Sequence, residues 1–478
     1  MVKKNSGNKY YLVGIKGVAM TAMAVYLKQK GMHVEGSDVE VKFQTDKILY
    51  EAGIKIKSGF TAANIDASKG VVISTGAHGG ATNIESRQAQ KLGLPFYMHG
   101  RFLGLETSFY RDVIAVSGCH GKTTTSAMTA FVLSAAGFDP SYAVGTAYIN
   151  GLGPAGHFGH SKYFIAEADE YVTCPITDNT PRFHYLAPKT AVITNIEYDH
   201  PDIYPDLENV INAYIEFTRK MKPGGLLIAC IDDPQVSQLL PRINSARVIT
   251  YGFSRRADFR IEKFYQSHGF QFAKITARNL TVSELMVKVP GKHNLLNALA
   301  AALICREYGL NWTSIKDKLK NFSGSSRRFE LIFKGKKLSL YDDYAHHPTE
   351  IKATLNAARS LAGRRLLIVI FQPHTFSRTK RLLNSFASSF IEADKVLVAD
   401  IFPSAREQPD PAVSSILLTD EMNKYKRNAR YVSGQKNALK YLTNILSEDS
   451  ILITMGAGDL YIWHDNLITL IKKYDREL

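Results

Sequence analysis

The chain has 478 residues and a mass of 53.2 kDa, which is enough for about three domains, each with a core of its own. Hydrophobic residues make up 45% and charged residues 22%, values that exclude a disordered chain. The net charge of +15 suits nucleic acid, an anionic surface or a polyanionic small substrate, and it does not choose among them.

The cysteines and the apolar runs exclude two further classes of protein. The four cysteines lie far apart, at positions 119, 174, 230 and 305, and form no CxxC pair. This spacing argues against a structural zinc site or a disulfide framework and favours the reducing cytoplasm. No apolar run approaches the roughly 20 residues of a membrane span.

Between Lys9 and Leu105, short apolar runs alternate with helical patterns. Strands are expected at 10–13, 34–38 and 71–74, and helices at 18–30 and 84–92. This alternation predicts βαβ units and a parallel sheet.

The alternation restarts at Asp112. The second region predicts strands at 113–116, 163–166, 191–194 and 226–229, and helices at 122–136 and 294–308. Residues 258–289 instead alternate polar and apolar side chains, as antiparallel strands do.

A third unit begins near the plausible linker 324–326. It predicts strands ending at 341 and spanning 366–370, 396–399 and 451–454, and helices at 349–360, 378–391 and 459–473. We therefore expect an α/β protein of three consecutive α/β units.

The sharpest local pattern is a phosphate loop between the strand 113–116 and the helix 122–136. Glycines let backbone N–H groups surround phosphate oxygens at a helix N-terminus. Lys122 is expected to reach the terminal phosphates, and the Thr123 hydroxyl to bind Mg²⁺. Val116 stands where a general phosphate loop has a glycine, so the loop is short on that side. The expected ATP-phosphate-binding residues are Gly118, Cys119, His120, Gly121, Lys122, Thr123 and Thr124.

A second glycine turn, Gly14 to Gly17, joins the first strand to its helix, and Asp38 ends the second strand. Lys16 occupies the position of the middle glycine of a dinucleotide motif. A tight βα turn and a ligand site are about equally compatible with this pattern alone. A lysine beside a helix start favours a phosphorylated ligand.

Two acidic motifs follow apolar strands: Glu167-Ala-Asp-Glu170, and Asn195 to His200. The carboxyl ends of parallel strands are where α/β proteins bind ligands. A carboxylate and a neutral imidazole near a triphosphate could hold a second Mg²⁺. Taken singly, either motif reads as solvated loop charge, but two beside a phosphate loop favour metal binding.

Later motifs carry basic residues at element boundaries. The adjacent pair His346 and His347 is better suited to hydrogen bonding than to ligating one metal ion. Arginines 327, 328, 378 and 381 could form a solvated basic face, but their positions suit capture of phosphate or carboxylate.

These motifs, in this order, resemble the Mur ligases, the ATP-dependent amide ligases of peptidoglycan synthesis. The resemblance covers almost the whole chain and rests on GCHGKTTT, GKHNLLNALAA, SSRRFE, YDDYAHHPTEI and FQPHTFSR. The last four segments look most like the members that join L-alanine to UDP-N-acetylmuramate. Cys119 replaces the usual threonine of the phosphate loop.

The resemblance implies three domains: a Rossmann-like UDP-sugar-binding domain over 1–108, a central phosphate-loop ATPase domain over 109–324, and a Rossmann-like amino-acid-binding domain over 325–478. It also implies the cofactors ATP and Mg²⁺. The substrate carboxylate would attack the γ-phosphate of ATP to give an acyl phosphate, whose carbonyl the amine then attacks.

The resemblance also implies residue roles. Catalysis would involve Lys122, Glu167, His200 and Arg328, and the metal ligands would be Thr123, Glu167 and His200. Beyond the phosphate loop, ATP would be bound by His293, Asn294, Asn297, Arg328 and Asp343. The UDP-sugar would be bound by Gly14, Lys16, Gly17 and Asp38, and the amino acid by His346, His347, Arg378 and Arg381.

Two alternatives stay open. The segments from Glu167 to Tyr171 and from Arg182 to Tyr185 look more like the ligase that attaches a murein tripeptide to the same UDP-sugar, whereas 349–351 and 371–374 favour L-alanine. A nucleotide-binding regulatory protein without ligase activity is the other alternative. We expect a cytoplasmic monomer or weak homodimer with no nucleic-acid or membrane partner.

Overall fold

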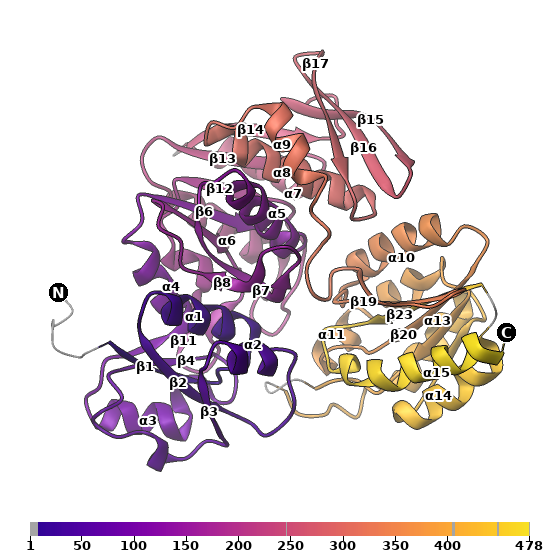
Figure 1. The fold of residues 1–478 in the computed structure, drawn as a ribbon, viewed down its shortest axis with the longest axis horizontal. Coiled ribbons are helices and arrows are strands. Elements are labelled where there is room, and N and C mark those ends of the chain that lie inside the picture. Colours follow the sequence, from indigo (N-terminus) through magenta and orange to yellow (C-terminus); the bar gives the residue numbers. More distant parts are fainter. Residues whose placement is uncertain (1–7, 245, 404–406, 447–448, 478) are drawn as a thin grey trace. The chain divides into compact units, whose positions relative to one another are not determined.

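The computed structural model describes residues 8–244, 246–403, 407–446 and 449–477. The chain divides into two compact units, Met1–Lys288 with Asn294–Ser325, and Val289–His293 with Ser326–Leu478. Figure 1 shows the helices and strands of both units, coloured along the sequence. None of the helices in the described ranges combines the length and apolar character that a membrane crossing requires.

The first sheet confirms the parallel arrangement expected for the N-terminal region. Its strand order is β3-β2-β1-β4-β5, and all four pairings are parallel. The strands are β1 (Lys9–Val13), β2 (His33–Asp38), β3 (Lys55–Ser58), β4 (Val71–Ser74) and β5 (Phe96–Met98). The helices are α1 (Val18–Gln29), α2 (Asp46–Glu51), α3 (Ile84–Lys91) and α4 (His99–Thr107).

The central sheet has ten strands in the order β17-β16-β15-β14-β13-β12-β6-β9-β7-β8. These are β6 (Asp112–Ser117), β7 (Ser141–Ile149), β8 (Gly153–His157), β9 (Tyr163–Glu167), β12 (Thr190–Ile193), β13 (Gly225–Cys230), β14 (Ala246–Gly252), β15 (Phe259–Ser267), β16 (Phe270–Ala277) and β17 (Leu280–Val287). A separate small hairpin joins β10 (Val172–Cys174) to β11 (Asp178–Pro181). The helices are α5 (Lys122–Ala135), α6 (Leu207–Arg219), α7 (Pro234–Leu239), α8 (Lys292–Glu307) and α9 (Trp312–Leu319).

The pairing of this sheet follows the sequence pattern. From β14 through β13, β12, β6 and β9 to β7 the strands are parallel, which brings their carboxyl ends to one edge. The expected antiparallel strands within 258–289 are confirmed, because β15 to β17 pair antiparallel (Figure 1). The phosphate-loop candidate lies at the common edge, between β6 and α5.

Helix α1 joins the first sheet to the central one. It packs on β7 and β8 so closely that a Cβ on Gly156 would lie 1.9 Å from the carbonyl oxygen of Ala22. One hydrophobic core runs through both sheets, from Leu12 to Phe164 and Tyr214. The N-terminal and central domains are therefore a single compact body.

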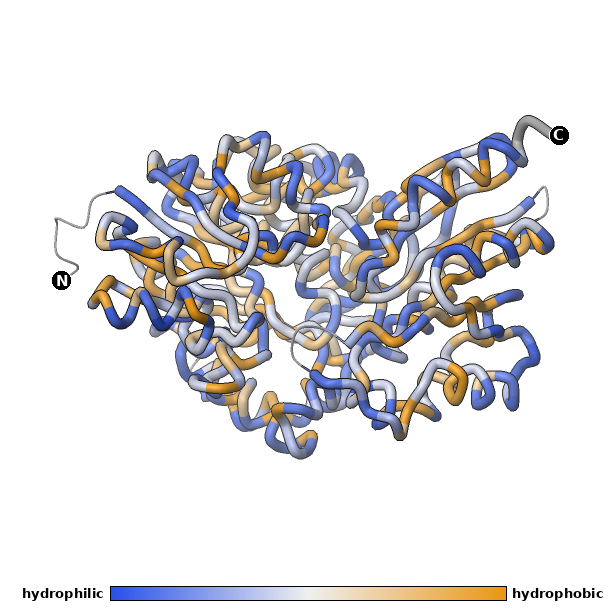
Figure 2. The backbone as a smooth tube through the Cα atoms, turned by 90° about the horizontal axis from the view of Figure 1, so that it is seen from below, coloured by the Kyte–Doolittle hydropathy of each residue, from blue (hydrophilic) through white to orange (hydrophobic). Residues whose placement is uncertain are grey.

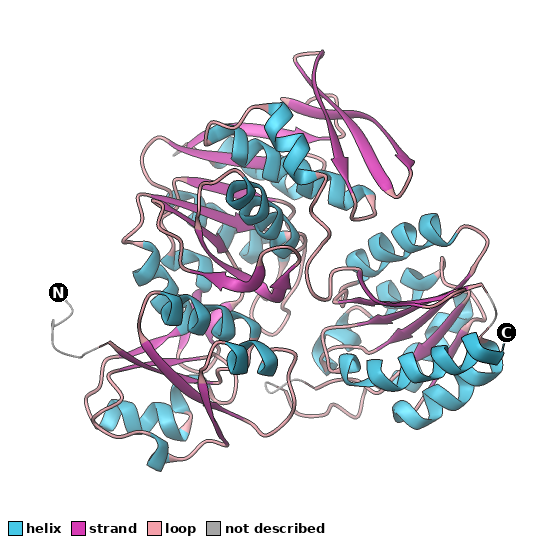
Figure 3. Ribbon diagram, viewed as in Figure 1, coloured by secondary structure: helices cyan, strands magenta, loops and turns pink. Residues whose placement is uncertain are grey.

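The second unit is a six-stranded sheet in the order β18-β19-β23-β20-β21-β22, with helices on both faces (Figure 3). Only β18 among these strands pairs antiparallel. The strands are β18 (Glu330–Lys334), β19 (Leu338–Asp343), β20 (Leu366–Phe371), β21 (Lys395–Val398), β22 (Ala429–Tyr431) and β23 (Ser450–Met455). The helices are α10 (Pro348–Ala362), α11 (Phe376–Arg381), α12 (Leu383–Ala387), α13 (Ser415–Tyr425), α14 (Gly434–Ile445) and α15 (His464–Glu477).

Amphipathic helices cover the two faces of this sheet. Hydrophilic and hydrophobic stretches alternate along α15, the helix that leads to the C-terminus (Figure 2). Leu467 and Ile471 of this helix are fully buried against one face, while Ile351 and Leu355 of α10 are buried against the other. The spacing of four residues in each pair is the helical period that places both side chains on one face.

Two expected helices differ in the structure. The single helix predicted over 378–391 is broken at Leu382, whose backbone (φ −107°, ψ 19°) leaves the helical region between α11 and α12. After α12, the Ser389 hydroxyl donates to the carbonyl of Ser385, a local bond that competes with a regular helix. The helix predicted over 459–473 begins as a 3₁₀ turn, and α15 starts only at His464.

A buried ion pair at the junction of the two sheets gives a test of this arrangement. Glu106 of α4 is buried and accepts from Lys30 and from the Tyr26 hydroxyl. Lys30→Met should destabilise the protein, because the buried Glu106 carboxylate loses its charged partner. The loss should be about 1–3 kcal/mol, less than for a fully buried pair, because Lys30 is only partly buried. Urea unfolding of Lys30→Met and of Lys30→Met/Glu106→Gln measures this; the double variant should be the more stable one, and equal stability would contradict the argument.

Candidate active site

The phosphate-loop candidate is built around two glycines at which any side chain would be strained. Gly118 has φ +131°, and a Cβ on it would lie 1.9 Å from Thr194 Oγ1. Gly121 has φ +83°, and a Cβ on it would lie 2.5 Å from Asn297 Oδ1. Backbone N–H groups can therefore turn inward at the start of α5, as an anion site needs. Val116 is buried within β6 and takes no part in the loop.

The side chain of Lys122, the first residue of α5, forms an ion pair with an acidic residue. Its Nζ donates to both carboxylate oxygens of Glu170, at 3.0 and 2.7 Å, and to the carbonyl of Cys119 at 3.3 Å. The two side chains are 12% and 2% exposed. Burial by itself would lower the pKa of Lys122, but the attraction of Glu170 outweighs it, so the pKa is raised and the lysine stays charged.

Glu167 ends β9 beside the same loop. Its Oε1 accepts from the Thr123 hydroxyl at 3.0 Å, and its Oε2 accepts from the N–H of Gly145 at 2.7 Å. A Cβ on Gly145 would lie 2.7 Å from the carboxylate, so this approach also requires glycine. The Thr123 hydroxyl oxygen of α5 and the Glu167 carboxylate oxygen of β9 are thus about as far apart as two neighbouring oxygen ligands of one small cation.

The loop after β12 is tied to the phosphate loop by several contacts. Asn195 accepts from the N–H of His120 at 2.8 Å and donates to its carbonyl at 2.9 Å. The Cys119 thiol donates to the carbonyl of Glu197 at 3.3 Å and accepts from its N–H at 3.1 Å. Burial raises the pKa of Cys119, so the thiol is protonated and able to donate.

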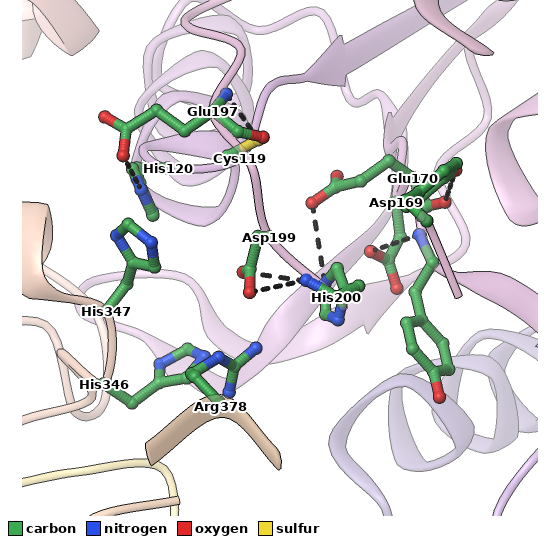
Figure 4. A network of polar contacts seen from close by, with 12 residues as sticks. Cys119, His120, Asp169, Glu170, Glu197, Asp199, His200, His346, His347 and Arg378 are labelled. Atoms are coloured by element: carbon green, nitrogen blue, oxygen red, sulfur yellow. Dashed lines mark hydrogen bonds and ion pairs between the residues drawn. The ribbon is translucent and has the colours of Figure 1, made fainter. Parts of the chain in front are cut away.

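His200 lies on this loop beside acidic side chains, as Figure 4 shows. Its Nε2 is 3.8 Å from Glu170 and 3.7 Å from Asp199. Its backbone has φ +58°, a left-handed conformation that is uncommon outside glycine. His200 lies beside Glu170 and Asp199, whereas Glu167 accepts from Thr123 and Gly145, so the two expected metal ligands contact different partners.

The three candidates His293, Asn294 and Asn297 lie in the first turns of α8. Asn297 donates to the side-chain oxygen of Asn294 at 3.1 Å, and both amides are buried. Because Asn297 also lies against Gly121, the start of this helix and the phosphate loop meet within the first unit.

The glycine turn of the first sheet is held from inside. Asp38 accepts from the N–H of Lys16 at 2.7 Å and of Val39 at 2.8 Å, and burial raises its pKa. Gly14 is left-handed, and a Cβ on it would lie 2.4 Å from the Thr75 side chain. Gly17 precedes α1 as its N-cap residue.

The ammonium group of Lys16 contacts protein rather than pointing outward. Its Nζ donates to the carbonyls of Val39 and Val41, each at 3.0 Å, and lies 3.5 Å from Asp46. Only 8% of the residue is exposed. These contacts tie the loop after β2 to the first turn, a role that the sequence did not suggest for this lysine.

In the second unit, Arg327 and Arg328 have different environments. Arg327 is buried, pairs with Asp342 at 2.9 Å and donates to the carbonyls of Gly456 and Gly458. It therefore holds strands together, and the expectation that it captures a ligand anion is wrong. Arg328 lies over the ring of Tyr344 at 5.0 Å and sits between two left-handed residues, 327 and 329.

Asp343 ends β19 in a fully hydrogen-bonded pocket. Its carboxylate accepts from the N–H groups of Phe329 at 2.7 Å and Ala345 at 2.8 Å and from the Thr354 hydroxyl at 3.1 Å. Burial raises its pKa to about 6, although the two N–H groups and Arg328 act in the opposite direction.

The two adjacent histidines make separate contacts. His347 is the N-cap of α10, where its ring accepts from the N–H of Thr349 and Glu350 returns a bond to its backbone. The Nδ1 of His346 lies 2.9 Å from the carbonyl of Tyr344 and 3.3 Å from Glu350. Both rings thus have hydrogen-bonding roles within the second unit.

The two C-terminal arginine candidates differ in burial. Arg378 is buried in α11 with its guanidinium 3.4 Å from His374 Nδ1, and the His374 and His346 rings lie 5.8 Å apart. Arg381, one turn further along α11, is exposed. Thr375, which precedes α11, has φ +67°, so the turn that presents Arg378 is strained.

Three polar residues of the site were not among the predicted ones. Glu170 pairs with Lys122, Asn195 holds His120, and His374 contacts Arg378. All three lie in motifs that the sequence displays, directly after strands or in the segment before α11. Their roles depend on partners 48, 75 and 4 residues away, which only the fold or the helical turn identifies.

The arrangement of these motifs agrees with comparisons against known proteins. The chain matches the description "Mur ligase family, catalytic domain" over residues 9–111, "Mur ligase middle domain" over 116–305, and "Mur ligase, glutamate ligase domain" over 327–458. It is 38% identical over 454 residues to a UDP-N-acetylmuramate–L-alanine ligase of Desulfitobacterium hafniense, covering 94% of this chain and 97% of that protein. The chain belongs to the Mur ligase family.

Solved structures of Mur ligases share the fold of this family member. The UDP-N-acetylmuramate–alanine ligase of Thermotoga maritima superposes with a TM-score of 0.80 at 25% identity, covering 98% of this chain and 100% of that one. A murein peptide ligase of Psychrobacter arcticus has a TM-score of 0.73 at 23% identity, covering 97% and 98%, and this shows the fold alone. The expected fold of three α/β domains is confirmed.

The buried Asp343 predicts a pH-dependent stability of the second unit. Its pKa is about 6 in the folded protein against 3.8 ordinarily, so the folded state favours the protonated form and loses stability as pH rises through 6. Relative to Asp343→Asn, the protein should lose about 2 kcal/mol between pH 4.5 and 8.

The reporter for this measurement is Trp463, which is buried in the second unit, in a background in which Trp312 of the first unit is changed to phenylalanine. Urea unfolding followed by the fluorescence of Trp463 gives the stability of both variants at each pH. A difference between them that does not change with pH would contradict the raised pKa.

Proposed function

We propose that this Mur ligase joins L-alanine to UDP-N-acetylmuramate at the expense of ATP, in peptidoglycan synthesis. The observation that carries the proposal is the charged lysine at the start of α5, which follows a glycine loop and pairs with Glu170, while the next residue, Thr123, donates to Glu167. This is a site for phosphoryl transfer, in which positioning and charge stabilisation supply most of the catalysis. The 38% identity to a UDP-N-acetylmuramate–L-alanine ligase supports the choice of substrates.

The proposed chemistry has two steps. The substrate carboxylate attacks the γ-phosphorus of ATP, ADP leaves, and an acyl phosphate forms. The amine of the amino acid then attacks the acyl carbon, inorganic phosphate leaves, and the amine loses a proton as the amide forms. Lys122 stabilises the charge on the transferring phosphoryl group, and the N–H groups of the first turn of α5 hold the phosphates.

The residues present fit a magnesium ion. Ligands of an octahedral Mg²⁺ lie 2.0–2.1 Å from the metal, so neighbouring oxygens are about 3 Å apart. The Thr123 hydroxyl and the Glu167 carboxylate are 3.0 Å apart. We propose that these two hold one ion and that His200 takes part in holding a second. Bound there, Mg²⁺ would neutralise phosphate charge during transfer.

We propose the remaining roles on the basis of the resemblance of these motifs to those of the Mur ligases. The proposed domains are 1–108 for the UDP-sugar, 109–324 for ATP and 325–478 for the amino acid. His293, Asn294, Asn297, Arg328 and Asp343 would contact the adenosine and phosphates of ATP. His346, His347, Arg378 and Arg381 would contact the amino acid, and the turn at Gly14–Gly17 with Asp38 would contact the UDP-sugar.

The second candidate function is attachment of a murein tripeptide. It is favoured by the segments from Glu167 to Tyr171 and from Arg182 to Tyr185, which look more like the ligase that attaches the tripeptide. The relatives that are 35–39% identical over 94–96% of this chain are named for L-alanine. We therefore place L-alanine first.

An acceptor assay tests the proposed function. With ATP, Mg²⁺ and UDP-N-acetylmuramate, phosphate release should be fastest with L-alanine and detectable with L-serine and glycine, because excluding one small group discriminates by only about 1–3 kcal/mol. Mass spectrometry of the product should show one added amino acid. Turnover with the tripeptide and none with L-alanine would overturn the choice of acceptor.

A second test separates the catalytic role of Lys122 from its structural one. Lys122→Met alone would leave Glu170 buried and unpaired, which costs about 3–5 kcal/mol. The variant to assay is therefore Lys122→Met/Glu170→Gln, compared with Glu170→Gln alone. The double variant should be folded by circular dichroism and should turn over at least about 100-fold more slowly than Glu170→Gln. Equal turnover would remove Lys122 from catalysis.

A further inference from the structure

Tyr171 follows the acidic motif directly and is 3% exposed. Its ring makes an edge contact with the imidazole of His200, with centroids 4.6 Å apart and planes at 61°. Such a contact between aromatic rings is favourable beyond the burial of area. The His200 ring is therefore confined by a residue from the segment that follows β9, two strands away from β12 in the sheet.

The hydroxyl of Tyr171 makes a separate contact with the same loop. It donates to the carboxylate of Asp202 at 2.7 Å, two residues beyond His200. Hydrogen bonds to an ionised acceptor are stronger than neutral ones. The loop that carries His200 is thus held at two points by one tyrosine.

The other side of Tyr171 is held by Arg182. The guanidinium lies 5.7 Å from the ring centroid and pairs with Asp169 at 2.7 Å. Arg182 follows the hairpin β10–β11, and it approaches Gly76 at the end of β4, where a Cβ would lie 3.7 Å from its Nη2. The position of the Tyr171 ring is therefore also supported by contacts that do not involve His200.

His200 needs such support because its backbone is left-handed, with φ +58°. A non-glycine residue in this conformation costs free energy and persists only where its surroundings hold it. The backbone carbonyl of His200 accepts from the N–H groups of Ile203 and Tyr204, each at 2.9 Å, which closes a tight turn. The direction of its imidazole depends on contacts outside that turn.

We propose that Tyr171 is a positioning residue for His200: its ring orients the imidazole, and its hydroxyl, through Asp202, fixes the loop that carries it. This proposal rests on the proposed function only in one respect, namely that the oriented His200 serves as a metal ligand. The positioning itself is a property of the folded chain. Tyr171 touches neither ATP nor substrate in this proposal.

The direct test is nuclear magnetic resonance of the protein labelled with ¹³C at histidine Cε1. Comparison with His200→Gln identifies the His200 signal among those of the 14 histidines. The Tyr171 ring should displace this signal in the wild type and in Tyr171→Phe. Loss of the ring current alone would shift the signal in Tyr171→Leu but leave it single and sharp. If Tyr171 orients the imidazole, the signal should also broaden or split, because the imidazole then adopts several orientations. A single sharp signal in Tyr171→Leu would overturn the proposal.

The hydroxyl is tested by the dependence of ligation on Mg²⁺. Tyr171→Phe and Asp202→Ala break the same hydrogen bond, so each should raise the Mg²⁺ concentration for half-maximal rate by about 2–10-fold, and the double variant no further. The ATP KM should change less. Additive effects of the two changes would overturn the role of the hydroxyl.

Tyr185→Phe is the matched control, because the Tyr185 hydroxyl also donates to an aspartate at 2.7 Å, but this aspartate, Asp178, belongs to β11 and not to the loop that carries His200. It should leave both the histidine signal and the Mg²⁺ dependence unchanged. If the wild type ligates no amino acid, the proposed function fails, and the histidine signal still decides whether Tyr171 positions His200.

Discussion

The ion pair between Lys122 and Glu170 is the contact on which the first unit's site depends. A lysine at the start of α5 and a carboxylate after β9 are both nearly excluded from water, and neither charge could remain there alone. Each buried charge stabilises the other, and this requires the ends of β6 and β9 to lie side by side. The pair thereby keeps the Lys122 ammonium charged beside the glycine loop at the start of α5.

The neighbouring loops extend this constraint. The segment from Glu167 to Tyr171 places successive polar side chains on Thr123, Arg182, Lys122 and Asp202. The Tyr204 hydroxyl donates to the carbonyl of Glu170 at 2.7 Å, which returns the later loop to the same segment. Because most of these contacts join different strand ends, a shift of one loop changes the others.

The first sheet serves this site as part of the same body. The tight packing of α1 on β7 and β8 and the common core leave no independent N-terminal lobe. Lys16 and Asp38 hold the glycine turn from within, and the ring of His78 lies 3.7 Å from the Asp38 carboxylate. In the second unit, Asp343 has a comparable place, since its hydrogen bonds with Phe329 and Ala345 link the turns on either side of β18 and β19.

The sequence by itself determined the local elements and the chemistry. Apolar runs of four to six residues marked β1, β4, β6 and β20 to within a residue or two, and glycine spacing marked the phosphate loop, because both depend on neighbours in the chain. The tertiary structure decided the partners. Which strand ends lie together decides three contacts that the sequence does not show. Lys16 binds loop carbonyls, Arg327 pairs with Asp342, and Lys122 faces Glu170 rather than solvent. A charged side chain shows its type in the sequence, but its free energy is set by burial and by residues far along the chain, and these exist only once the sheets have formed.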